Sequence, residues 1–170
     1  GLSLVWSRVF SYIVENAIVG IAQRASDTAA PRMDRERLQQ ELARGRRCAA
    51  QFAVQRERIK QRLADAARRG RIALFGAGHL GCTFINLLEL KDAIAFVVDD
   101  HPSKQGLFMP GSRLPIRGSA ALAEDGIRLC LLGLSPESEE MIIARQGGFR
   151  AQGGEFASIL MASPRALKVD

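Results

Sequence analysis

The chain has 170 residues, of which 47% are hydrophobic, and this suits one domain of ordinary size with a core plus an extension. Its net charge is +6. Residues 1–70 hold 14 of the 24 Lys and Arg but only 7 of the 18 Asp and Glu, so the positive excess belongs to that part. Acidic residues among these arginines, together with a single Trp and a single Tyr, argue against nucleic-acid binding.

The three cysteines, Cys48, Cys82 and Cys130, are far apart in the sequence and form no C-x-x-C pair. This spacing argues against a disulfide framework or a structural zinc site and favours the cytoplasm as the compartment. The first residues do not show the basic, apolar and small-residue pattern of a signal peptide, so none is expected there. The first residue is Gly1 rather than Met, as expected of a piece of a longer protein.

Residues 2–23 are mostly apolar, but Arg8 and Glu15 interrupt them, so a transmembrane segment is not expected. Polar residues recur at every fourth position, at Ser3, Ser7, Ser11 and Glu15. On a helix this spacing draws a polar stripe beside a broad apolar face. We therefore expect an amphipathic helix over 2–23 that packs on a missing domain or on a second subunit.

Residues 26–31 are predicted to form a linker, and 34–69 a long helix without proline. One stripe of this helix is mainly apolar, and its members are spaced by four and three residues. Two members, Gly45 and Arg56, do not suit a continuous zipper, so we favour a helix that lies on the next domain over self-association. The stripe consists of Leu38, Leu42, Gly45, Ala49, Phe52, Arg56, Ile59, Leu63 and Ala66.

After Gly70 short apolar runs alternate with helical segments, which indicates a parallel sheet with right-handed crossovers. The expected domains are therefore a helical extension over 1–69 and a Rossmann-like domain over 70–170. The fold class is α/β, with four or five parallel strands and helices on both faces. Strands are predicted at 72–75, 95–98, 114–116, 129–132 and 156–161, and helices at 82–90, at 119–124 and from Ser135 to Gly147-Gly148.

The first βαβ unit carries the glycine loop, which spans 76–81 and reads G-x-G-x-x-G. Gly76 suits a tight turn, Gly78 lets the backbone approach a phosphate, and Gly81 allows close packing of the helix on the strand. The amides at the helix start favour an anion. Asp99 follows the second strand, near the place where such folds put a ribose-binding carboxylate. This pattern predicts nucleotide binding, although a turn that needs glycine only for tightness is the alternative.

Other polar residues near this loop are less informative. His79, in the first helical turn, is expected to be neutral and to donate a hydrogen bond, or simply to be exposed. The sequence Asp99-Asp100-His101 resembles a metal site, but adjacent residues at a strand end point in different directions, so no metal is expected. Lys104 is positioned to reach a phosphate or to remain in solvent. No catalytic residue is recognised.

Three segments carry a family resemblance by their order and spacing. They are Leu-Phe-Gly-Ala-Gly-His at 74–79, Phe-Val-Val-Asp-Asp at 96–100, and Lys-Gln-Gly-Leu-Phe-Met-Pro-Gly-Ser-Arg-Leu-Pro-Ile at 104–116. Together they resemble the C-terminal domain of the sugar C-methyltransferases, enzymes that methylate a carbon of a nucleotide-linked deoxysugar with S-adenosylmethionine. The third segment is the most specific.

The resemblance implies a part that binds and orients the sugar nucleotide and is not catalytic on its own. It places S-adenosylmethionine in a separate upstream methyltransferase domain and assigns no cofactor to this chain. By this resemblance, the missing domain expected to contact the N-terminal helices is that methyltransferase domain. Two other functions fit the residues: a stand-alone nucleotide-binding or regulatory module with a protein partner, and an NAD-dependent oxidoreductase. The expected ligand-binding residues are Gly76, Gly78, His79, Gly81, Asp99, Lys104, Gln105 and Gly111.

Overall fold

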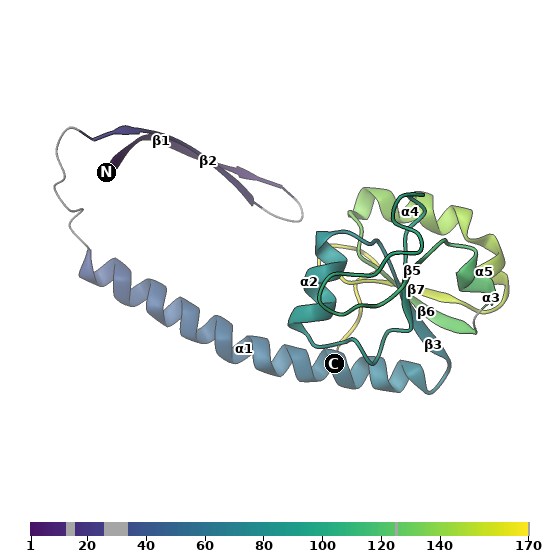
Figure 1. The fold of residues 1–170 in the computed structure, drawn as a ribbon. Helices are drawn as coiled ribbons and strands as arrows, with labels where there is room; N and C mark the ends of the chain where they lie inside the picture. The colour runs from purple at the N-terminus through teal and green to yellow at the C-terminus, as the bar shows by residue number, and fades with distance from the viewer. Residues whose placement is uncertain (13–15, 26–33, 125, 170) are drawn as a thin grey trace. The chain divides into compact units, whose positions relative to one another are not determined.

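The structure is a computed structural model that describes residues 1–12, 16–25, 34–124 and 126–169. Two compact units divide the chain, residues 1–52 and 53–170. The first holds strands β1 (Leu2–Ser11) and β2 (Asn16–Arg24) and the N-terminal half of helix α1 (Arg35–Ala67). The second holds the rest of α1 and an α/β sheet (Figure 1). The predicted linker at 26–31 lies outside the described residues.

The helix predicted over 2–23 is wrong, because β1 and β2 form an antiparallel hairpin. A spacing of four residues is an even number, so it gathers polar residues on one face of a strand as readily as on one face of a helix. Aromatic and β-branched residues such as Trp6, Val9 and Ile18 decide between the two, because they favour the extended backbone. The N-terminal part of the predicted helical extension is therefore a hairpin.

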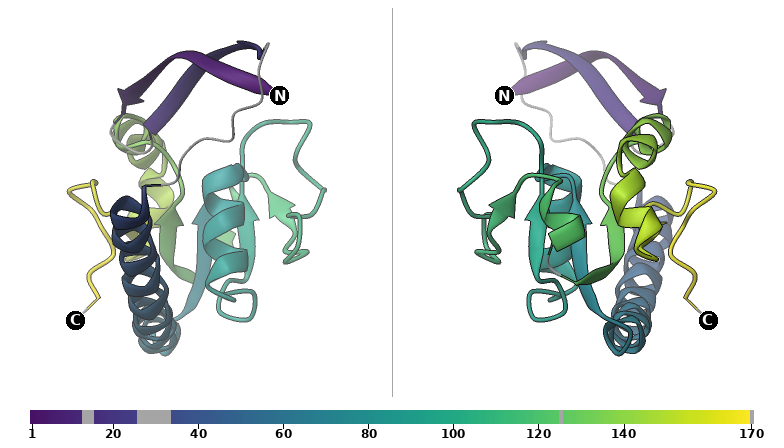
Figure 2. Two further views of the ribbon diagram at one scale, coloured as in Figure 1. Left: turned by 90° about the vertical axis from the view of Figure 1, so that its left-hand side faces the viewer. Right: turned by 90° about the vertical axis from the view of Figure 1, so that its right-hand side faces the viewer.

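The predicted fold class of the remaining chain is confirmed by a parallel sheet of five strands in the order β5-β4-β3-β6-β7. Helices lie on both faces of this sheet, as Figure 2 shows from two sides. The strands are β3 (Arg71–Phe75), β4 (Phe96–Val98), β5 (Ile116–Arg117), β6 (Ile127–Leu132) and β7 (Glu155–Ser158). The helices that follow α1 are α2 (His79–Leu87), α3 (Ala121–Glu124), α4 (Pro136–Arg145) and α5 (Gly147–Ala151).

Two apolar clusters hold the layers together, one on each face of the sheet. On the first face Leu63 of α1 and Ile85 of α2 pack against Leu74. On the second face Leu122, Ile143 and Phe149 bring in α3, α4 and α5. The glycine pair Gly147-Gly148 does not end the preceding helix as predicted, since α4 already ends at Arg145 and the pair begins α5.

Helix α1 is buried only in its C-terminal half. Leu63 is 0% exposed, whereas Leu38 and Leu42 on the same stripe are 38% and 43% exposed. Arg56, which interrupts the stripe, forms an ion pair with Glu89 at 3.3 Å, and Lys60 reaches the same carboxylate at 2.8 Å. The expectation that this helix lies on the next domain therefore holds for its second half. No described helix is long and apolar enough to span a membrane.

The buried half of α1 is expected to contribute strongly to the stability of the sheet unit. Leu63→Ala leaves a cavity between α1 and the sheet and should lower the free energy of unfolding by about 2–5 kcal/mol. Leu42→Ala, on the exposed stretch of the same stripe, should change it by less than about 0.5 kcal/mol. Urea denaturation followed by circular dichroism measures both, and equal losses would show that Leu63 is not part of the core.

Candidate active-site edge of the sheet

The candidate site lies where the parallel strands end. Strands β3, β4 and β5 proceed to one side of the sheet, whereas β6 and β7 lie on the other side of β3. The order therefore reverses between β3 and β6, and ligands of open α/β sheets bind outside the carboxyl ends of strands at such a point. The Gly133 amide donates to the Phe75 carbonyl at 2.8 Å, which brings the loops after β6 and β3 together.

The glycine loop has the geometry that its spacing predicts. Gly76 has a φ of +111°, and a Cβ there would come 2.8 Å from the Gly133 carbonyl oxygen. A Cβ on Gly81 would come 2.5 Å from the Gly76 oxygen, so the start of α2 packs directly on the turn. Gly78, in contrast, has no atom within 4 Å of its Cβ position and is exposed. The loop is thus packed on its inner side and open on its outer side.

Asp99 ties this loop to the end of the neighbouring strand. Its Oδ2 accepts a hydrogen bond from the Ala77 amide at 3.0 Å and another from Lys104 Nζ at 2.8 Å. Its Oδ1 accepts one from the His101 amide at 2.9 Å. The side chain of Asp99 is only 15% exposed. The carboxylate predicted to bind a ribose therefore directs most of its acceptor capacity to its own chain.

The environment of Asp99 favours its charged form. Burial by itself raises the pKa of this carboxyl, but the hydrogen bonds from Lys104 and from the two amides outweigh it and hold the pKa below its usual value. The neighbouring positive charge of Lys104 acts in the same direction. Asp99 is consequently an anion that organises the loop at neutral pH.

Gln105 and Lys104 lie at the same edge as Asp99. The Gln105 side-chain amide donates to the Asp99 carbonyl at 3.3 Å and lies against Gly118, where a Cβ would come within 3.3 Å of it. Lys104 is half-buried, and its ammonium group pairs with Asp99. The ion pair of Lys104 and Asp99 therefore stands beside the glycine loop, with the ammonium group partly exposed.

The segment 104–116 forms a hairpin that extends the sheet. The Gly106 amide donates to the Ile116 carbonyl at 3.0 Å and the Met109 amide to the Leu114 carbonyl at 2.8 Å. The tip of this hairpin rests on α2, where the Asn86 side chain donates to the Pro110 carbonyl at 3.0 Å. Gly111, which has a φ of +76°, lies against Asn86 near the C-terminal end of α2, so it is apart from the glycine loop.

The histidines occupy exposed positions. His79 is the first residue of α2 and lies beside Gly78, which is also exposed. His101 accepts hydrogen bonds on Nδ1 from the Ser103 amide at 3.3 Å, and its ring pairs with the Ser103 hydroxyl at 2.8 Å. Among the described residues no three His, Cys, Asp or Glu side chains gather as a metal site would need. The ligand-binding roles of the loop residues stay predictions.

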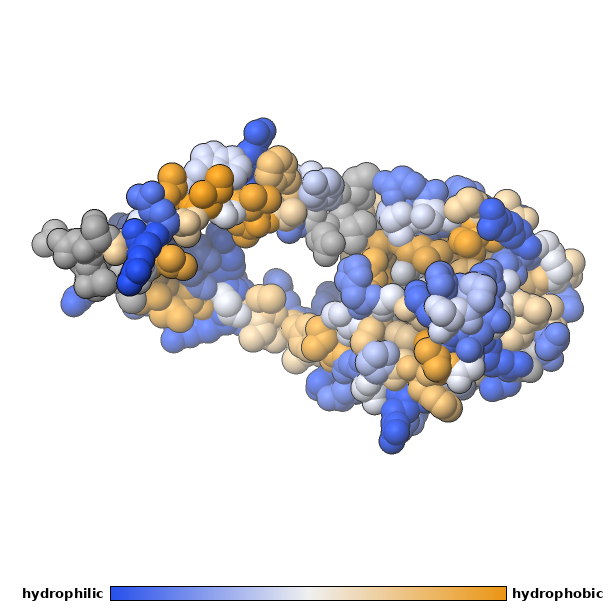
Figure 3. Space-filling model, turned by 45° about the horizontal axis from the view of Figure 1, so that its top comes forward, coloured by the Kyte–Doolittle hydropathy of each residue, from blue (hydrophilic) through white to orange (hydrophobic). Residues whose placement is uncertain are grey.

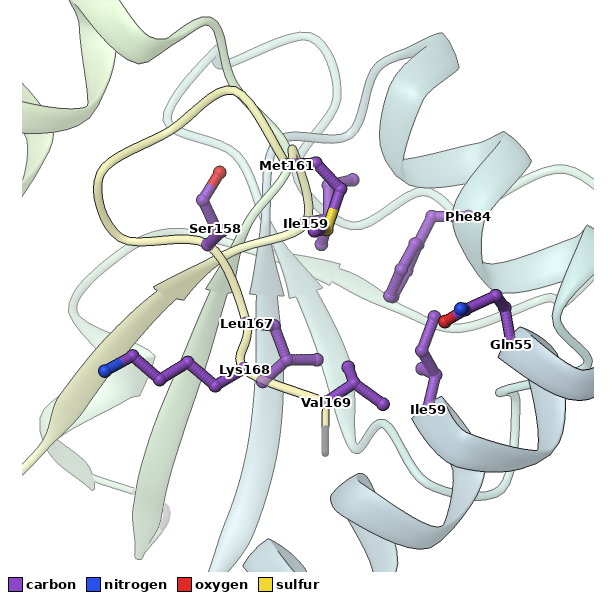
Figure 4. Close-up of a pocket in the computed structure, with 10 residues that line it drawn as sticks. Gln55, Ile59, Phe84, Ser158, Ile159, Met161, Leu167, Lys168 and Val169 are labelled. Atoms are coloured by element: carbon purple, nitrogen blue, oxygen red, sulfur yellow. The ribbon is translucent and has the colours of Figure 1, made fainter.

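A cavity of about 410 Å³, away from the glycine loop, was not foreseen from the sequence. It lies between α1, α2 and the segment that follows β7, and apolar side chains such as Ile59, Phe84 and Met161 line it (Figure 4). The Lys168 side chain extends away from them in this view. Such a lining suits an apolar group and not a phosphate. Its residues come from three distant segments without a shared motif, so no local signal announces it.

Comparison with known proteins places these features in a family context. A family model described as the C-methyltransferase C-terminal domain matches residues 18–160. The match begins inside β2 and includes the glycine loop, Asp99 and the 104–116 hairpin. It confirms the resemblance to C-methyltransferase C-terminal domains. No curated protein matches the chain.

The Asp99 network predicts a pH-dependent loss of stability. Asp99→Asn removes the charge that holds Lys104 and two amides, and at neutral pH it should lower the free energy of unfolding by about 1.5–3 kcal/mol. Because folding lowers the pKa of Asp99, the contribution of this carboxylate to the free energy of unfolding is present above its unfolded pKa of about 3.9. That contribution is lost as the pH falls through the pKa that Asp99 has in the folded state. Urea denaturation from pH 7 down to acid should therefore show a shrinking difference in stability between the unsubstituted chain and Asp99→Asn.

Asp92→Asn, at an exposed position, is the control and should change the free energy of unfolding by less than about 0.5 kcal/mol. A loss of stability from Asp99→Asn that stays constant with pH would contradict the role of Asp99 as a charged carboxylate.

Proposed function

Because the chain belongs to the family of C-methyltransferase C-terminal domains, we propose that its sheet unit binds a nucleotide-linked sugar for such an enzyme. The phosphate groups lie at the glycine loop in this proposal. The chain holds and orients this substrate, and the methyl group is transferred by another part of the enzyme.

The open outer side of the glycine loop is the observation that carries this proposal. The first amides of a helix have no partner within the helix, and those of α2 begin beside Gly78, where nothing lies within 4 Å of the Cβ position. The helix dipole adds a partial positive charge at the same point. Lys104 lies nearby, paired with Asp99 at 2.8 Å, and its ammonium group has further N–H donors for a phosphate oxygen. A diphosphate would bind there by access to the backbone and by a shared contact with this ammonium group.

The same edge fits S-adenosylmethionine and NAD less well. Both carry a ribose whose hydroxyls, in many α/β folds, bind a carboxylate at the end of the second strand. Here Asp99 already accepts hydrogen bonds from Ala77, His101 and Lys104. A ribose would have to compete with these three donors. S-adenosylmethionine supplies the methyl group in the reaction that the family resemblance implies, and we assign its binding to another part of the enzyme.

Ligand-induced thermal stabilisation tests the proposal directly. At one hundred times its Kd, dTDP or UDP should raise the free energy of unfolding of the sheet unit by about 2.7 kcal/mol. S-adenosylmethionine and NAD at equal concentrations should leave the unfolding midpoint unchanged. Stabilisation by S-adenosylmethionine alone would refute a substrate-binding role, and stabilisation by NAD alone would favour an oxidoreductase.

A glycine substitution locates the binding at the loop. Gly78→Val adds a side chain in open space at an ordinary φ, so the fold should persist while the approach of a phosphate to the backbone is blocked. The shift given by the nucleoside diphosphate should then disappear. Gly148→Val is the matched control, because its Cβ position is also open but lies in α5. If both variants keep the shift, the ligand does not bind at the glycine loop.

A further inference from the structure

The β1–β2 hairpin exposes apolar side chains along its length. Leu4 is 68% exposed, Val9 and Ile21 are each 57% exposed, and Ile18 is 75% exposed. Figure 3 shows the apolar residues of the hairpin gathered at its surface. A single two-stranded hairpin is marginally stable at best in water, so strands of ten and nine residues with this composition require a partner.

The strand register places large apolar side chains on both faces of the hairpin. Residues paired across an antiparallel ladder share a face. Trp6 pairs with Ile21, and Phe10 follows on the same face beside Ala17. Val9 pairs with Ile18 on the opposite face, where Leu4 pairs with Ala22. Strands that are apolar on both faces are typical of sheets covered by helices on either side.

Two kinds of partner fit this pattern poorly. A membrane-bound element has one apolar and one polar face, so a lipid surface would leave one face of this hairpin in water. A second copy of the chain would cover one face by stacking its own hairpin. It would also bring two basic surfaces together, since the described part of residues 1–52 holds seven Arg and three Asp or Glu. The whole chain carries a net charge of +6, so two copies would repel each other.

Charge adds a further requirement for the partner that covers the hairpin, here called the occupant. Arg8 lies on the same face as Trp6 and stacks over the Phe10 ring at 5.1 Å, so covering this face buries a guanidinium group. A buried cation is costly without an opposite charge beside it. The occupant must therefore present a carboxylate opposite Arg8 within an otherwise apolar surface.

We propose that the hairpin pairs with an open edge of the sheet of a separate α/β domain, whose helices cover both hairpin faces and whose carboxylate meets Arg8. The unpaired backbone groups along the outer edge of β1 or β2 supply the ladder to that sheet. The family match begins at residue 18, inside β2, so the hairpin crosses the boundary of the matched domain. An element in this position joins the C-terminal domain to another part of a C-methyltransferase.

Trp6 makes this contact measurable, because it is the only Trp of the chain and lies on the hairpin. The probe is the methyl-transferring part of a C-methyltransferase in a Trp-free variant, added as a separate polypeptide to the full chain; this choice rests on family membership and not on the nucleotide site. Trp6 emission should shift to shorter wavelength and saturate. An unchanged emission would overturn the proposal. The same shift given by vesicles of phosphatidylcholine and phosphatidylglycerol, or by raising the concentration of the chain alone, would indicate a membrane or a second copy and would also overturn it.

Three conservative substitutions test whether both faces are covered. Ile21→Thr and Val9→Thr keep a β-branched residue on opposite faces at equal exposure, and each should weaken binding at least about fivefold by burying an unpaired hydroxyl. Ser11→Thr, at the polar end of the Val9 face, should leave the affinity unchanged. An effect of Ile21→Thr alone would indicate an occupant on one face and refute strand addition. Stabilisation by dTDP or UDP should be the same in all three variants, so the nucleotide site and the hairpin contact are judged separately.

Discussion

The Asp99 carboxylate is the interaction on which the geometry of the candidate site depends. It joins the glycine loop after β3, the end of β4 and the turn that carries Lys104, through donors on Ala77, His101 and Lys104. Backbone hydrogen bonds join the same segments, from the Gly76 amide to the Val98 carbonyl at 2.8 Å and from the Lys104 amide to the His101 carbonyl at 3.0 Å. The Asp99 anion adds the side-chain contacts that connect the turn before the exposed Gly78 with the ammonium group of Lys104.

The surrounding fold explains why Asp99 and its three donors are enough to hold the glycine loop in place. Gly76 and Gly81 bring the turn, the start of α2 and the loop after β6 so close that side chains would not fit between them. The 104–116 hairpin adds backbone hydrogen bonds on the outer side and rests on α2 through Asn86. The loop is consequently enclosed on every side but one. What remains accessible is the backbone around Gly78, at the start of α2, where the helix dipole favours an anion.

Sequence reasoning succeeded where the physical signal is local. The apolar run before Gly76 and the glycine spacing predict a buried strand, a tight turn and a close helix contact, and the structure shows all three. It failed at residues 2–23, where a repeat of four suits a helix and a strand equally and the outcome depends on β propensity. The assignment of Asp99 to a ligand stays a prediction, and no sequence pattern reveals that Ala77 and Lys104 donate hydrogen bonds to its Oδ2. The cavity at Phe84 depends on contacts between segments far apart in the chain and was equally inaccessible.

The 104–116 hairpin has a consequence for how such sequences diverge. Gly106 and Gly111 have φ values of +81° and +76°, so other residues there strain the backbone before any ligand is considered. Leu107 and Phe108 between them are 56% and 64% exposed and carry no comparable constraint. Selection for folding alone would therefore preserve the glycines of this segment among members of the family. Sequence differences between members should accumulate at the exposed positions between them.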